Sequence, residues 1–172
     1  MLVLKSVFQI LDKIFPAKIV YAHCDIPCGI YDPHLAQLSA HTVIRMDMLI
    51  SQLKVPSESM KPEDKNDYHH KMARYTDVKE KHAELCKHEI RIIWGDYFKP
   101  DHLQKFPELH DIVWKIMKAG SKSKQDTDIK SAEELLENVN KFAEIFWKTK
   151  GIETSHVKAP YPTEHDTVVP KA

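Results

Sequence analysis

Apolar residues recur at intervals of three and four positions through much of the chain, which is the spacing of one face of an α-helix. The first such segment covers residues 34–53, and a polar connection with two prolines separates it from a second segment at 72–94. A third covers 109–120, and the clearest covers 132–151. No strand pattern competes, so the spacing predicts four helices.

Four helices with one apolar face each can close a single core when loops of moderate length join them. The predicted fold is therefore all-α, an antiparallel up-down four-helix bundle, preceded by a short segment rich in potential metal ligands. Residues 152–172 contain three prolines and little periodicity. We expect this tail to be disordered, and residues 23–151 to form one domain.

Residues 1–22 form an apolar segment interrupted by Lys5, Asp12, Lys13 and Lys18. Val20 and Ala22 are small residues of the kind found before a signal-peptidase site, but a signal's apolar region normally runs without such interruptions. We expect residues 1–22 to be a removable leader of another kind. No apolar run in the chain is long enough for a membrane span.

The composition argues against a nucleic-acid partner and against a fold stabilised by many disulfides. The 172 residues include 25 Lys and Arg and 25 Asp and Glu, so the net charge is zero and no basic run marks a nucleic-acid surface. We therefore expect no nucleic-acid partner. Three cysteines are too few for a disulfide scaffold, and their odd number excludes complete pairing.

Two of these cysteines lie in the stretch HCDIPCGIYDP at residues 23–33. A three-residue spacer excludes a redox C-x-x-C motif, and no second pair of ligands follows at zinc-finger spacing. The cysteines alone would favour a local disulfide or two ordinary thiols. The third cysteine, Cys86, lies on the apolar side of the second predicted helix, and we expect it to be buried.

The spacing acquires a chemical meaning if proteolysis makes His23 the first residue. Two carbons then separate its free amine from the backbone nitrogen of Cys24, and two more separate that nitrogen from the Cys24 sulfur. Pro27 and Gly29 allow the chain to curl until the Cys28 sulfur completes a plane of two nitrogens and two sulfurs. Such a plane suits divalent nickel or copper and not zinc, and the imidazole remains free for an axial position.

The stretch resembles the nickel-binding hook of the nickel superoxide dismutases, whose pattern is H-C-D-x-P-C-G-x-Y-D-P. Nine positions agree, namely His23, Cys24, Asp25, Pro27, Cys28, Gly29, Tyr31, Asp32 and Pro33. Residues 82–110 and 145–150 also resemble the family, so the resemblance covers most of residues 23–150. It implies a four-helix bundle assembled as a homohexamer, and a leader that a dedicated peptidase removes to expose the histidine.

The resemblance also implies the site. Nickel would cycle between Ni2+ and Ni3+, held by the amine and imidazole of His23, the amide nitrogen and thiolate of Cys24, and the thiolate of Cys28. Tyr31 and Tyr97 match tyrosines that line the approach to the metal. Asp25 would support residues 23–33, called the hook below, by hydrogen bonding.

The chain departs from the family pattern at two positions near the axial ligand. Where a glutamate and an arginine accompany the axial histidine, this chain has Ser39 and His82. His41 and His82 are the candidates to replace those contacts, on which axial ligation and redox tuning depend.

The implied reaction is the disproportionation of superoxide to dioxygen and hydrogen peroxide, in the cytoplasm or, through the leader, after export. Two alternatives stay open at this point. One is a helical bundle that stores or delivers nickel or copper without turnover. The other is a structural bundle with a disulfide between Cys24 and Cys28.

Overall fold

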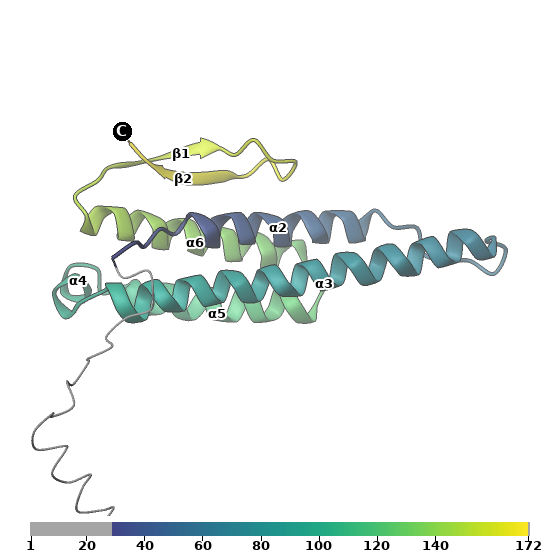
Figure 1. The fold of residues 1–172 in the computed structure, drawn as a ribbon, viewed down its shortest axis with the longest axis horizontal. Helices are drawn as coiled ribbons and strands as arrows, with labels where there is room; N and C mark the ends of the chain where they lie inside the picture. The colour runs from purple at the N-terminus through teal and green to yellow at the C-terminus, as the bar shows by residue number, and fades with distance from the viewer. Residues whose placement is uncertain (1–28, 172) are drawn as a thin grey trace, which may run out of the picture.

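The structure is mainly helical. The computed structural model describes residues 29–171, and Figure 1 shows long helices lying side by side with a short β-hairpin over them. Along the chain the elements are α2 (His34–Ser51), α3 (Pro62–Ile92), a π-helical turn η1 (Ile93–Tyr97), α4 (Pro100–Lys105), α5 (Leu109–Gln125), α6 (Ile129–Thr149), β1 (Thr154–Lys158) and β2 (Asp166–Pro170). The prediction of a mainly helical chain is confirmed.

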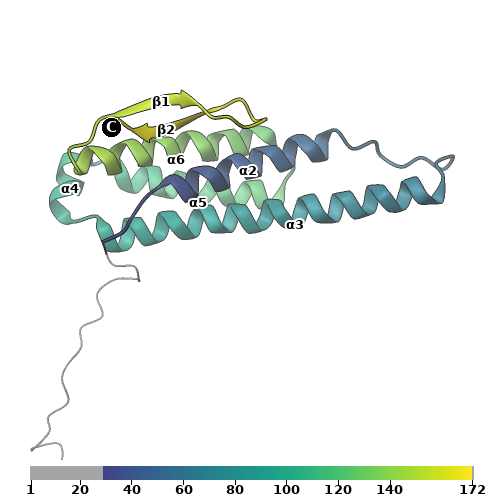
Figure 2. The same ribbon diagram turned by 45° about the horizontal axis from the view of Figure 1, so that its top comes forward.

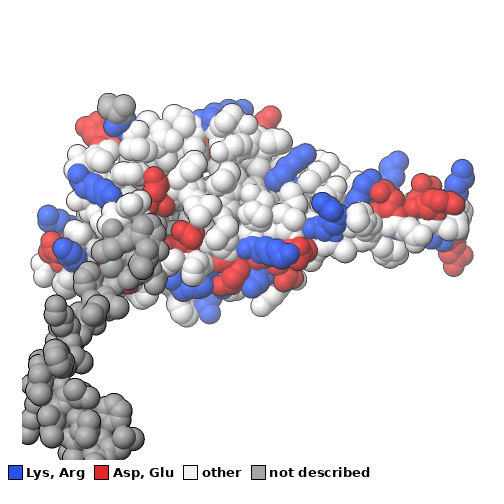
Figure 3. Space-filling view, in the orientation of Figure 1, with Lys and Arg blue, Asp and Glu red and all other residues white. Residues whose placement is uncertain are grey.

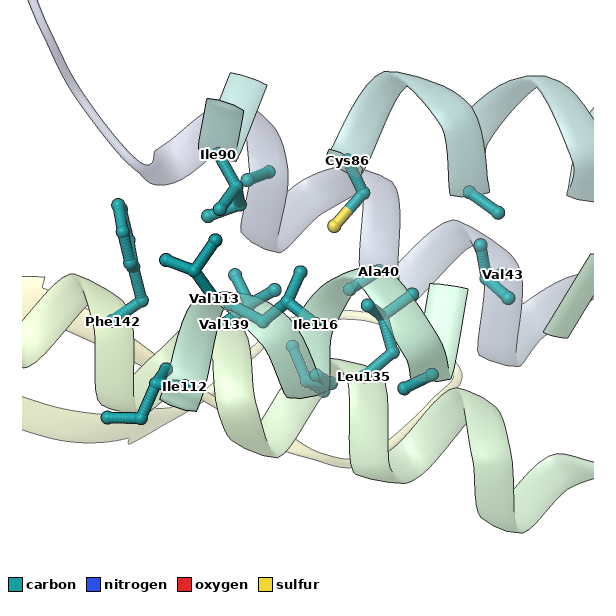
Figure 4. Close-up of a cluster of buried hydrophobic side chains, with 14 of the residues drawn as sticks. Ala40, Val43, Cys86, Ile90, Ile112, Val113, Ile116, Leu135, Val139 and Phe142 are labelled. Atoms are coloured by element: carbon teal, nitrogen blue, oxygen red, sulfur yellow. The ribbon is translucent and has the colours of Figure 1, made fainter. Parts of the chain in front are cut away.

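The core lies between α2, α3, α5 and α6. Helices α2 and α5 each pack against both α3 and α6. Figure 4 shows the side chains that these helices direct toward one another, among them Ala40, Ile90, Ile116 and Phe142, and each of these four is completely buried. Complete burial of a large apolar side chain stabilises the folded state by about 1.5–3 kcal/mol. Cys86 belongs to this cluster, so its predicted burial is confirmed.

A buried ion pair joins α2 to α3. Lys79 of α3 places its Nζ 3.0 Å from Asp47 Oδ1 of α2, and both side chains are at most 3% exposed. The same ammonium group donates a hydrogen bond to the carbonyl of Asp126, in the connection between α5 and α6. Because a buried charge is stable only when it is paired and hydrogen-bonded, this contact fixes three elements relative to one another.

The first part of α3, with the loop before it, projects from the body of the molecule. We call residues 52–75 the arm; Figures 1 and 2 show it extending past the ends of α5 and α6. Proline and acidic residues, which favour a helix start, open α3 as Pro62, Glu63 and Asp64. Figure 3 shows acidic and basic side chains interspersed along the arm.

The predicted disorder of residues 152–172 is wrong for the part that the structure describes. Strands β1 and β2 pair antiparallel, from Thr154 opposite Pro170 to Lys158 opposite Asp166. The hairpin packs on α6, where Thr167 and Val168 of β2 are buried (Figure 2). Of the three prolines, two lie in the turn and one ends β2, so none interrupts the ladder. The fold is therefore mostly helical, with one short hairpin that the sequence did not predict.

Among residues 29–171, no helix combines the length and the apolar character needed to cross a membrane.

Candidate metal centre

Four of the six predicted site residues lie outside the described part of the chain: His23, Cys24, Asp25 and Cys28. Tyr31 and Tyr97 lie within it. The structure brings these two tyrosines together, with ring centroids 5.8 Å apart and planes inclined by 56°. Tyr31, three residues after Cys28, and Tyr97, at the end of η1, therefore lie side by side in the folded chain.

The described end of the hook turns sharply into α2. Gly29 has a φ of +84°, in the left-handed region that L-residues with a side chain avoid. Asp32 accepts a hydrogen bond from the backbone N–H of His34 through Oδ1 at 2.8 Å, and α2 begins at His34. These two features shape residues 29–33, the described part of the hook, where the chain enters α2.

Tyr97 is held by α6. It lies in the π-helical turn that ends α3, and its ring packs on Phe146 at a centroid distance of 4.8 Å. Its hydroxyl lies 2.8 Å from Thr149 Oγ1, and Thr149 donates its one hydroxyl proton to the carbonyl of Phe146 at 2.6 Å. Tyr97 must therefore be the donor to Thr149. Within residues 29–171, no hydrogen bond to the Tyr97 oxygen other than the one with Thr149 is present.

Three neighbours of Tyr97 were not predicted as site residues. His102 stacks on its ring at 5.7 Å, and the Lys150 ammonium lies 5.6 Å from its ring centroid. Thr149 and Lys150 end the last predicted helix, and no local pattern distinguishes them from ordinary polar residues at a helix end. Only their approach to Tyr97 in the folded chain identifies them.

The described residues provide no competing metal site. No group of three or more His, Cys, Asp or Glu side chains within residues 29–171 could hold a metal ion. Burial raises the pKa of the Cys86 thiol to about 12, so this cysteine cannot supply a thiolate at neutral pH. Cys86 is therefore not a candidate thiolate ligand.

At the two positions that depart from the family pattern, each side chain makes a hydrogen bond within its own helix. Ser39 Oγ donates to the carbonyl of Leu35 at 2.7 Å. His82 places Nδ1 2.8 Å from the carbonyl of Val78. His41 makes its hydrogen bond to the C-terminal hairpin, as described below. The hydrogen bonds of Ser39 and His82 thus stay within α2 and α3, and that of His41 goes to the hairpin turn.

Comparison with known proteins shows the family. Residues 18–150 match the family model of nickel-containing superoxide dismutase. Over 141 residues the chain is 40% identical to the superoxide dismutase [Ni] of Streptomyces coelicolor and also to that of Streptomyces seoulensis, with 81% of this chain and 98% of each relative covered. A native structure of nickel superoxide dismutase solved at 1.30 Å superposes with a TM-score of 0.63 at 37% identity, covering 74% of this chain and 99% of that one.

The chain belongs to the nickel-containing superoxide dismutase family. The family match ends at Lys150, so β1 and β2 lie outside it.

Proposed function

We propose that this protein, once processed to begin at His23, is a nickel superoxide dismutase that converts two superoxide ions and two protons into dioxygen and hydrogen peroxide. The family match over residues 18–150 is the observation that carries this proposal. It favours catalysis over metal storage, because the relatives are named for the reaction and not for the metal alone.

The nickel ligands would be the amine and imidazole of His23, the amide nitrogen and thiolate of Cys24, and the thiolate of Cys28. When bound there, the ion supplies a one-electron acceptor in one half of the reaction and a one-electron donor in the other. Supporting this assignment, the only other cysteine is buried in the core with a pKa near 12. Asp25 would hold the hook by hydrogen bonding.

The tyrosines would shape the approach. The hydrogen bond from Tyr97 ends, through Thr149, at a backbone carbonyl, which has no proton to pass on. We infer that this chain of bonds orients Tyr97 and does not deliver protons. The Tyr97 oxygen could accept a hydrogen bond from a water molecule, and such a water would be a proton source for peroxide formation.

We extend the proposal to architecture and maturation. Helices α2, α3, α5 and α6 would form the antiparallel up-down four-helix bundle, and six chains would assemble as the homohexamer. Residues 1–22 would be a leader removed by a peptidase. The cytoplasm would be the compartment, because reducing conditions keep Cys24 and Cys28 available as thiolates.

The test compares two nickel-loaded chains, one that begins at His23 and one that retains Ala22. Superoxide decay is followed by stopped-flow spectroscopy, and bound nickel by elemental analysis. We expect rapid decay only for the chain beginning at His23, because an acylated nitrogen at residue 23 cannot complete the ligand set. Equal activity in both chains would refute the chelate argument.

Cysteine variants provide the matched controls. Cys24→Ser and Cys28→Ser should lose nickel and activity, whereas Cys86→Ser should retain nickel. Nickel binding with no superoxide decay in the chain beginning at His23 would instead establish the storage alternative. Loss of two free thiols without any bound nickel would establish the disulfide alternative.

A further inference from the structure

A buried polar junction joins the C-terminal hairpin to both α2 and α6. Gln37 of α2 donates through Nε2 to Asn140 Oδ1 of α6 at 2.9 Å and to the carbonyl of Val168 of β2 at 3.0 Å. Asn140 donates in turn through Nδ2 to the carbonyl of Asp166 at 2.9 Å. Gln37 is 1% exposed and Asn140 8% exposed. Three elements therefore meet through three hydrogen bonds made by two buried side chains.

The direction of these bonds is fixed. A Gln amide nitrogen has two protons, and here each has an acceptor, one on α6 and one on β2. Turning the amide over would set its oxygen against the Val168 carbonyl and the Asn140 oxygen, two acceptors that it cannot satisfy. The junction consequently accepts one arrangement of α2, α6 and the hairpin.

A second contact between α2 and the hairpin lies one helical turn further along α2. His41 lies four residues after Gln37, on the same face of the helix. Its Nδ1 is 2.9 Å from Thr163 Oγ1 in the hairpin turn, and its ring meets Tyr161 edge to face at 5.1 Å. The hairpin thus contacts two successive turns of α2, beginning one turn after the hook ends.

The hairpin is tied equally closely to α6. Gly151, with a φ of +71°, reverses the chain after α6, and the N–H of Ile152 donates to the carbonyl of Trp147 at 3.0 Å. The hairpin therefore starts next to Thr149, the residue that holds Tyr97. Along the strands, His156 lies 2.6 Å from a Glu144 oxygen of α6.

We propose that the C-terminal hairpin is a positioning element for the metal centre: it clamps α2 to α6 through Gln37 and His41, and so sets where the hook begins relative to Tyr97. Tyr31 lies in the segment that leads into α2, and Tyr97, in η1 after α3, is held against α6 by Thr149 and Phe146, so the packing of the two rings depends on how α2 and α6 lie. This inference rests on the proposed function, because it assigns the hook to nickel. It gives residues beyond the family match a role in the reaction.

The test replaces Gln37 by Met in the full mature chain. Met has similar length and no hydrogen-bonding protons, so it leaves the Val168 carbonyl and the Asn140 oxygen buried without a donor. Gln52→Met is the matched control, because Gln52 is exposed at the opposite end of α2. Thr163→Val, which removes the partner of His41, is the milder variant if Gln37→Met does not fold.

Two measurements are needed. In the nickel-free protein, amide hydrogen exchange over residues 31–40 should be accelerated roughly tenfold by Gln37→Met, or by Thr163→Val where that variant is used, and unchanged by Gln52→Met. In the oxidised, nickel-loaded protein, the electron paramagnetic resonance spectrum should broaden or split in the same variant, because the hook no longer has one position.

Equal exchange in the tested variant and the Gln52→Met control would overturn the proposal. Accelerated exchange with an unchanged nickel spectrum would also overturn it, since the hairpin would then stabilise α2 without positioning the metal. If the wild-type chain binds nickel but consumes no superoxide, the proposed function fails, while the exchange comparison in the nickel-free protein still reports whether the hairpin holds α2.

Discussion

Folding of this protein should weaken in mild acid because of one buried histidine. His41 is 3% exposed, and burial is the main reason that its pKa is lowered from 6.5 to about 4. The neighbouring His165 and His34 lower it further, and Arg45 lines the same small cavity. Among the described residues, Nε2 of His41 has no hydrogen-bond partner, so nothing compensates a second proton there.

The sign and size of the change in folding stability with pH follow from the difference between the pKa of His41 in the folded and in the unfolded chain. Between pH 6.5 and about 4 the unfolded chain binds a proton at His41 that the folded chain does not, so stability falls as the pH is lowered through this interval. Each pKa unit corresponds to about 1.4 kcal/mol, which gives a loss of about 3 kcal/mol between neutral pH and pH 4. His41→Gln keeps a hydrogen-bonding group for Thr163 but cannot titrate, and should lack this loss.

The assay is urea unfolding of nickel-free wild type and His41→Gln at several values between about pH 4.5 and about pH 7.5. The difference in free energy of unfolding removes the contributions of all other titrating groups. It should favour the wild type progressively as the pH rises. His88→Gln, on the exposed face of α3, controls for the exchange of His for Gln. Parallel wild-type and His41→Gln curves would refute the assignment of a neutral, buried imidazole.

Three further substitutions test the core, the third cysteine and the hook turn. Lys79→Met should lower the free energy of unfolding by about 3–5 kcal/mol, because Asp47 keeps a buried charge without its cation, and adding Asp47→Leu should restore most of it in urea titrations. Cys86→Ala should cost about 1 kcal/mol for the small cavity and leave the nickel content unchanged by elemental analysis; a fall in bound nickel would contradict the ligand assignment. Gly29→Ala should lower the thermal midpoint by placing a side chain at φ +84°, a cost of about 1–2 kcal/mol, and an unchanged midpoint would show that the turn relaxes freely.

The helices could be predicted wherever they pack on one another. The last helix was expected at 132–151 and lies at Ile129–Thr149, starting earlier because Asp128 caps it, with Oδ1 accepting from the N–H of Lys130. The second was expected from residue 72, yet α3 begins at Pro62. Its first ten residues belong to the arm, where most of them are exposed, so they show no periodic apolar pattern from which a helix could be predicted.

The hairpin was missed for a different reason. Its strands have five residues each, and its stability comes from Val168 and Thr167 pressed onto α6 and from bonds to Gln37 and Asn140. Those partners lie far away along the chain, so the local hydrophobic pattern of residues 152–172 could not predict these contacts. Similarly, the resemblance to the family indicated Tyr31 and Tyr97, but it could not show that Thr149 orients Tyr97.

The arm affects how the number of subunits in the assembly should be measured. An elongated molecule meets more friction in solution than a sphere of equal mass, so the protein should elute early from a gel-filtration column. A subunit count read from elution volume would then be too high. Light scattering or sedimentation equilibrium, which do not depend on shape, are the measurements by which the number of chains in the particle should be decided.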